Sequence, residues 1–271
     1  MSAGGAGEEA TSSYSPQTMM GIGIIGGLVG IYLGALLSPT HPVLSFLGGI
    51  GAICAIVWGA DAVRRVASYG LGTGVPSIGM IALGMGIVAS LFGLSIGGSF
   101  AGPIVAFISA AIIGAIIGLL ANKVIGMGIP IMEQAMVEIA GAGSLVIIGL
   151  CTVITGTFEY SAVIENVVAP GYIAMIFIFG GMGILHPFNA NLGPDEKQDR
   201  TLSVAIEKGA LALVVAGIAS AINEGLEAAF VTALIGVIIW YLAFKKYFEF
   251  VKRDAHKVVG TGMLPTEEEL Q

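Results

Sequence analysis

The chain has 271 residues, of which 56% are hydrophobic and only 11% are charged, and its formal net charge is −7. Soluble domains average roughly 25% charged residues, and the smaller share found here cannot cover the surface of a soluble globule of this size. The composition therefore excludes an ordinary water-soluble enzyme and predicts a chain that is solvated by membrane lipid. We expect no nucleic-acid partner.

Apolar runs long enough to cross a bilayer follow one another along the chain. A spanning helix needs about 20 apolar residues, and three of the links between the runs are short enough to form antiparallel hairpins. We therefore predict an all-α polytopic membrane protein of about eight transmembrane helices in hairpin pairs. The predicted spans are 19–37, 43–60, 77–97, 101–121, 139–156, 167–186, 206–223 and 226–244.

The predicted spans divide the chain into three parts. Residues 1–18 are expected to form a flexible cytoplasmic tail, residues 19–244 the transmembrane domain, and residues 245–271 a second cytoplasmic tail. With an even number of spans both termini lie on one side, and all 11 basic residues then fall on that side or at its edge. Because lysine and arginine concentrate in cytoplasmic loops, we expect a multi-pass protein of the cell membrane with both termini in the cytoplasm.

A short glycine–proline motif occurs before two of the spans. Its copies are Gly72-Thr-Gly-Val-Pro76 and Gly126-Met-Gly-Ile-Pro130. Glycine permits a tight turn and proline suits the start of a helix. The repetition favours a duplicated helix-pair unit, and the turns are either re-entrant or interfacial.

Asp61 ends the second predicted span and is followed closely by Arg64 and Arg65. One reading is a structural ion pair, because residues three and four apart are neighbours on a helix. The other reading is a cation ligand near the inner mouth of a path, because polar groups at membrane depth are often functional.

Glu133 and Glu138 flank the start of the fifth span, and the nearest basic residue in the sequence is Lys123 upstream. We therefore expect two unpaired carboxylates beside a proline turn, which are candidates for a sodium path because hard cations prefer oxygen ligands. The alternative is an interfacial turn that lies in water. The hydroxyl of Thr152 is a further candidate ligand, unless it only bonds back to its own helix.

The segment from His186 to Arg200 is polar and densely charged, which suits either a docking face for a soluble partner or a solvated loop. His186 has no second histidine or cysteine nearby to complete a metal site. The sequence also lacks a phosphate-binding loop and a dinucleotide fingerprint. We therefore expect no catalytic residue and no bound cofactor in this chain itself.

Three stretches, residues 57–77, 121–138 and 181–201, resemble the C subunit of tetrahydromethanopterin S-methyltransferase, and the resemblance extends over essentially the whole chain. It implies a membrane subunit of a complex that moves a methyl group from methyl-tetrahydromethanopterin to coenzyme M and couples this transfer to sodium export. It also implies that the corrinoid lies in a partner subunit, and that other membrane subunits help to form the sodium path.

Three roles remain open for such a chain. It can contribute to the sodium path and anchor the soluble subunits, it can be a purely structural scaffold, or it can be a stand-alone cation-coupled secondary transporter. Transporters of that class tend to place charged groups at the bilayer midplane, whereas the ionisable residues here fall near the ends of the spans. This distribution favours a path built between subunits.

Overall fold

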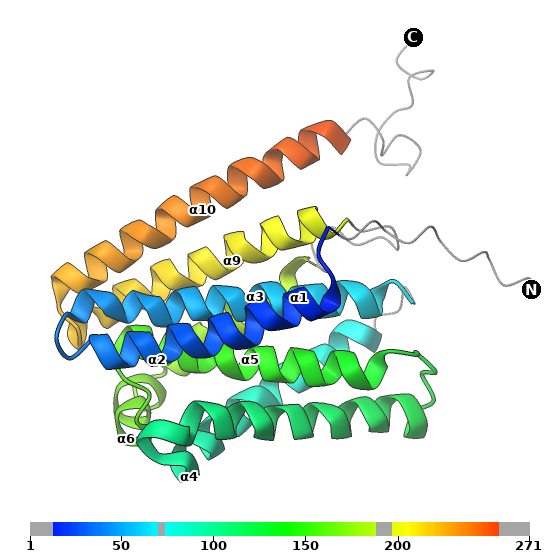
Figure 1. Ribbon diagram of the computed structural model, residues 1–271, viewed down its shortest axis with the longest axis horizontal. Coiled ribbons are helices and arrows are strands. Elements are labelled where there is room, and N and C mark those ends of the chain that lie inside the picture. Colours follow the sequence, from blue (N-terminus) through cyan, green and yellow to red (C-terminus); the bar gives the residue numbers. More distant parts are fainter. Residues whose placement is uncertain (1–12, 70–73, 188–196, 255–271) are drawn as a thin grey trace, which may run out of the picture.

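The computed structural model describes residues 13–69, 74–187 and 197–254, and every regular element in these ranges is helical (Figure 1). The elements in chain order are α1 (Pro16–Gly21), η1 (Ile22–Gly26), α2 (Gly27–Leu37), η2 (Pro42–Ser45), α3 (Phe46–Ala67), α4 (Gly74–Leu119), η3 (Leu120–Val124), α5 (Met132–Thr155), α6 (Tyr160–Val163), η4 (Ile164–Val168), α7 (Tyr172–Phe179), η5 (Gly181–Ile184), α9 (Gln198–Ala219), η6 (Ser220–Ile222) and α10 (Leu226–Asp254).

Six helices of the described chain are long and apolar enough to cross a membrane, and a seventh span is added if a bent helix pair counts as one. The longest of them, α4, is two helical arms joined at Gly98, whose φ of 62° reverses the chain. These arms correspond to the predicted spans 77–97 and 101–121. The predicted all-α polytopic membrane fold is therefore confirmed.

The bent pair replaces a predicted straight span. The sequence suggested one helix over residues 167–186, but the structure has Tyr160–Val168 and Tyr172–Ile184 meeting at 88°. Gly171 lies at the break with a φ of 85°, a conformation that costs other residues about 1–2 kcal/mol. Hydropathy alone did not reveal this change of direction.

Helix α5 forms the centre of the bundle, with α3 on one side and the two arms of α4 on the other (Figure 1). The most apolar window of α5 is 94% buried, whereas the windows of α4 and α10 are 28% buried. Small residues permit this packing, because a Cβ atom on Gly149 of α5 would lie 2.5 Å from the carbonyl oxygen of Gly48. Close backbone approach of this kind is typical of helices packed in membranes.

The bundle has two chemically different ends. The start of α1, the end of α3 and the end of α10 lie at one end (Figure 1), which we call the basic end because Arg64 and Arg65 occupy the last turn of α3. The opposite end, which holds the α2–η2 and η6–α10 links, is called the acidic end. Helices start at Pro16 and continue to Asp254. Both predicted tails lie largely outside the described residues and stay predictions.

The second glycine–proline motif forms a tight turn at the basic end. Gly126 and Gly128 have φ angles of 82° and 66°, and the side-chain oxygen of Asn122 accepts a hydrogen bond of 2.8 Å from the backbone N–H of Ile129. The first motif lies partly outside the described residues, so the proposed duplication stays a prediction.

Candidate functional site

The basic end contains a buried cluster of charged residues that starts at Asp61. Arg64 donates to one Asp61 oxygen from Nε at 3.0 Å and from Nη2 at 2.9 Å, and Arg65 Nε donates to the other oxygen at 3.1 Å. The Asp61 side chain is completely buried. The predicted ion pair within one helical turn of α3 is thus present, and Asp61 pairs with both arginines.

Glu138 joins the same cluster from α5. Arg65 Nη2 donates to Oε2 of Glu138, as does Trp58 Nε1 at 2.9 Å, while Gln134 Nε2 donates to Oε1 at 2.8 Å. The expectation that Glu138 is unpaired is therefore wrong. Its partner is 73 residues away in the sequence, and only the packing of α3 against α5 brings the two together.

Helix α9 and the segment before α1 complete the cluster. Gln198 Nε2 donates to Asp61 at 3.0 Å and also to the carbonyl oxygen of Tyr14 at 3.0 Å. The backbone N–H of Tyr14 donates to the Gln198 side-chain oxygen at 2.8 Å. The N-terminal segment is thereby tied to the residue that holds Asp61.

The cluster carries no net formal charge, because two carboxylates face two guanidinium groups. Breaking a buried ion pair by removing one partner typically costs about 3–5 kcal/mol, since the remaining charge stays buried. Asp61 accepts four hydrogen bonds and Glu138 accepts three, all from N–H donors, and Arg65 donates to both carboxylates.

Glu133 lies outside this cluster. Both of its carboxylate oxygens accept hydrogen bonds from Asn122 Nδ2, at 3.0 and 3.1 Å. The hydrogen-bond partner of Glu133 is therefore an amide and not a cation. Asn122 thus connects Glu133 to the glycine turn at residues 126–130.

Thr152 is also far from the charged cluster. It lies 14 residues after Glu138 on α5, which corresponds to about 21 Å of helix. Its hydroxyl donates to the carbonyl oxygen of Ile148 at 3.0 Å, and a Cβ atom on Gly48 would meet its side chain at 2.9 Å. The four candidate ligands do not form one site, and only Asp61 and Glu138 are brought together.

A second group of polar residues ties three loops together at the acidic end. Ser38 Oγ donates to Glu224 at 2.5 Å, and Asn223 Nδ2 donates to the carbonyl oxygen of Ile154 at 3.2 Å. Gly156 ends α5 with a φ of 65°, and a Cβ atom there would lie 2.5 Å from Glu224 Oε1. Partial burial raises the pKa of Glu224, and the hydrogen bond from Ser38 opposes that shift.

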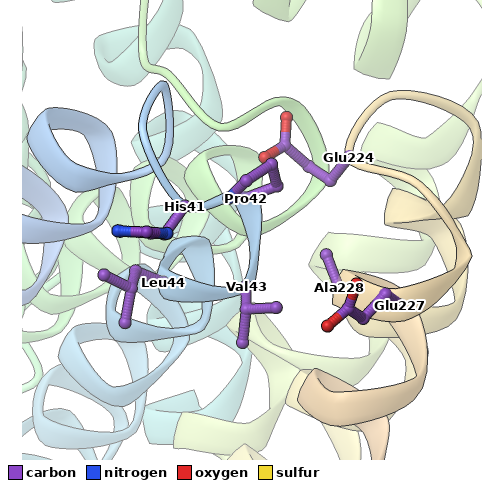
Figure 2. Close-up of a pocket in the computed structure, with 7 residues that line it drawn as sticks. All are labelled: His41, Pro42, Val43, Leu44, Glu224, Glu227 and Ala228. Carbon is purple, nitrogen blue, oxygen red and sulfur yellow. The ribbon is translucent and has the colours of Figure 1, made fainter.

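A cavity of about 440 Å³ lies beside Glu224, between the start of η2 and the start of α10. Figure 2 shows that the side chains of His41, Glu224 and Glu227 point in different directions and do not converge on one point. Among the described residues no group of three or more histidine, cysteine, aspartate or glutamate side chains could hold a metal ion. The described side chains that line this cavity therefore offer no cluster of three such ligands.

His186 also belongs to no metal site in the described part of the chain. Burial lowers its pKa, and the nearby Lys208 lowers it further, whereas Glu207 acts in the opposite direction. Glu207 pairs with Lys208 at 3.3 Å. Residues 188–196, which hold most of the predicted docking segment, lie outside the described residues.

Sequence reasoning missed Trp58, Gln134 and Gln198 as members of the cluster. Helical spacing offered a signal for the first two, because Trp58 and Asp61 are three residues apart and Gln134 and Glu138 are four apart. Gln198 is 137 residues from Asp61. No local pattern could have identified it.

Comparison with known proteins assigns the chain to a family. A family model that describes the C subunit of tetrahydromethanopterin S-methyltransferase matches residues 1–268. Relatives described as this same C subunit include those of Methanosarcina barkeri (70% identical) and Methanosarcina acetivorans (73%), with 100% of both chains covered. The protein of Methanothermobacter thermautotrophicus is 42% identical, over 97% of this chain and 98% of its own. The chain belongs to the family of the tetrahydromethanopterin S-methyltransferase C subunit.

Proposed function

We propose that this chain is a membrane subunit of a complex that transfers a methyl group from methyl-tetrahydromethanopterin to coenzyme M and couples the transfer to sodium translocation. The chain itself has no catalytic residue and binds no cofactor. The corrinoid lies in a partner subunit, and other membrane subunits surround this one. The basic end faces the cytoplasm, where it anchors the soluble part of the complex.

One observation carries the assignment to the sodium path. Asp61 and Glu138, from two neighbouring central helices, share Arg65 as a common partner in a buried cluster. Carboxylate oxygens are suitable ligands for a hard cation. Arg65 then acts as a tethered cation that holds the two carboxylates until a sodium ion replaces it.

The coupling requires two states with different sodium affinity. In the described state both carboxylates are occupied by N–H donors, so sodium affinity at this point is low. In the second state Arg65 leaves the cluster and sodium takes its place. Tyr14 and Gln198 connect Asp61 to the N-terminal segment, which gives a partner subunit on that side a direct mechanical link to the cluster.

The test is the sodium dependence of methyl transfer by the assembled complex with Glu138→Gln or Asp61→Asn in this chain. An amide keeps much of the hydrogen bonding but removes a negative charge. We expect the sodium concentration for half-maximal stimulation to rise by about tenfold or more, because cation affinity depends on the number of charged ligands. Glu249→Gln, at an exposed position on α10, is the matched control and should leave the sodium dependence unchanged.

The second candidate function is a scaffold that only packs against other subunits, and the closed, charge-balanced cluster favours it. A scaffold predicts that the Glu138→Gln and Asp61→Asn complexes, once assembled, keep the sodium dependence of the unaltered complex. That result would exclude Asp61 and Glu138 from the sodium path. A shift in sodium dependence with normal assembly would exclude the pure scaffold.

A further inference from the structure

The last turns of α10 are longer than membrane crossing requires. The helix contains 29 residues, which correspond to about 43 Å at 1.5 Å per residue. The hydrocarbon core of a bilayer is about 30 Å thick. If α10 enters the core at its first residues, its last two or three turns lie at the level of the lipid headgroups.

The end of α10 combines aromatic and basic residues, and we call residues 240–252 the aromatic–basic segment. It begins within the hydrocarbon, because Trp240 lies about 21 Å from Leu226 along the helix, and it ends at headgroup level. Trp240, Phe244 and Phe248 follow one another in four-residue steps and stack, with ring centroids 5.4 and 6.0 Å apart. The next step is Lys252, whose ammonium lies 4.7 Å from the Phe248 ring centroid. The segment therefore presents one aromatic face that ends in a positive charge.

Two further lysines are exposed on the same segment. By helical spacing Lys245 lies beside Phe248 and Lys252, four residues before Glu249, and the ammonium of Lys246 lies 5.9 Å from the Phe250 ring centroid. Among the described residues no ion pair engages Lys245, Lys246 or Lys252. Aromatic rings concentrate at membrane interfaces, and basic residues next to a membrane span are attracted to anionic lipid headgroups.

The described part of the chain leaves the last turns of this segment uncovered. Ala243 is the last buried residue of α10 among the described side chains, and Phe244 and Phe248 are 39% and 45% exposed. Figure 1 shows the C-terminal part of α10 diverging from α9 at the basic end. The packing of α10 against α9 is concentrated earlier, where Gly236 meets Val214.

We propose that the aromatic–basic segment is a binding site for anionic lipid headgroups, with its phenylalanine rings at the edge of the hydrocarbon and its lysines in contact with phosphate groups. The segment combines the three features that such a site needs: lysines at headgroup depth, an exposed aromatic face and a net positive charge, since three lysines face the single Glu249. This inference does not depend on the proposed sodium path.

Native mass spectrometry of the full-length chain tests the proposal. The chain is released from detergent micelles that contain either phosphatidylglycerol or phosphatidylcholine with identical acyl chains. We expect preferential retention of phosphatidylglycerol, weakened by about fivefold for each lysine removed in K245Q/K246Q. The matched control is K123Q/K197Q, which removes two exposed charges from the same end of the bundle. It should leave this preference intact.

A second measurement reports the depth of Trp240 in the bilayer. Bromines on lipid acyl chains quench nearby tryptophans, and the signal of Trp240 is isolated by subtracting the W240F variant, since Trp58 is only 2% exposed. Trp240 lies 14 residues after Leu226, about 21 Å along the helix and therefore about 6 Å beyond the bilayer centre, so we expect bromines at an intermediate acyl depth to quench it more than bromines next to the headgroup. Equal retention of both lipids, equal losses in the two double variants, or absence of quenching would overturn the proposal, and the last result would indicate that protein covers the segment.

Discussion

The two ends of the helical bundle bury carboxylates in different ways. At the basic end Asp61 and Glu138 are surrounded by arginine, tryptophan and amide donors. At the acidic end Glu224 is half-buried, and its carboxylate accepts a hydrogen bond from the hydroxyl of Ser38. The first arrangement balances charge by ion pairing, whereas in the second the cost of burial appears as a raised pKa.

This difference indicates what each end is built to do. A closed, neutral cluster links α3, α5 and α9 through ion pairs and hydrogen bonds. A half-buried carboxylate beside a cavity instead responds to proton concentration. Substitutions that disturb one contact at a time at each end separate the two arrangements.

The largest effect is expected from Arg65→Met at the basic end. This change leaves Glu138 without its cation and Asp61 with one arginine fewer, and uncompensated buried charge typically costs about 3–5 kcal/mol. Thermal unfolding of the full chain in detergent should show a large drop in the midpoint. Arg64→Met is the comparison, because it also leaves the cluster with one excess negative charge but keeps every partner of Glu138, so a larger loss for Arg65→Met reports the broken link between α3 and α5.

A double substitution sharpens this prediction. If uncompensated charge causes the loss, Arg65→Met combined with Glu138→Gln should be less destabilised than the sum of the two single variants. Strict additivity would mean that Arg65 and Glu138 are not energetically coupled. In that case the cluster could not work as a unit in which one ion replaces another.

An intermediate effect is expected from Gly156→Ala at the acidic end. The positive φ alone costs an alanine about 1–2 kcal/mol, and its Cβ atom would also displace the Glu224 carboxylate and the Ser38 hydroxyl. Gly171→Ala is the control, because Gly171 also has a positive φ but no atom lies within 4 Å of the added Cβ. The difference between the two thermal midpoints measures the contact of the three loops, and equal midpoints would show that this contact contributes no stability.

The local part of the basic-end cluster could be predicted from sequence, and the long-range part could not. The pairing of Asp61 with the arginines follows from helical spacing. The partners of Glu138 on α3 come from packing between helices, which no spacing rule contains. The span predicted over residues 139–156 also excluded Glu138 because hydropathy counts a carboxylate as polar, yet α5 begins at Met132. A charge paired with arginine can be accommodated inside the helix bundle.

The fold could be predicted from the sequence more completely than the site could, and the reason is physical. Length and hydropathy determine where a helix can cross a bilayer, and these quantities are local in sequence. The bend near Gly171 was missed because glycine within an apolar run fits either a packed helix or a break. The contact between the loops of the acidic end was missed for the same reason as the cluster, since Ser38 and Glu224 are 186 residues apart.

The smallest effect is expected from the titration of Glu224. Because its folded-state pKa is raised, the folded chain binds this proton more tightly than the unfolded chain does. Stability should therefore fall as pH rises from the ordinary carboxyl range through the raised value, and it should be highest, as far as this group is concerned, below that range.

Glu224→Gln removes this contribution and still accepts the Ser38 hydrogen bond. The thermal midpoint of the variant should depend less steeply on pH in that window, while Glu159→Gln, an exposed carboxylate in the α5–α6 link, should keep the original slope. Identical slopes in all three proteins would show that Glu224 is not the group that makes the acidic end sensitive to pH.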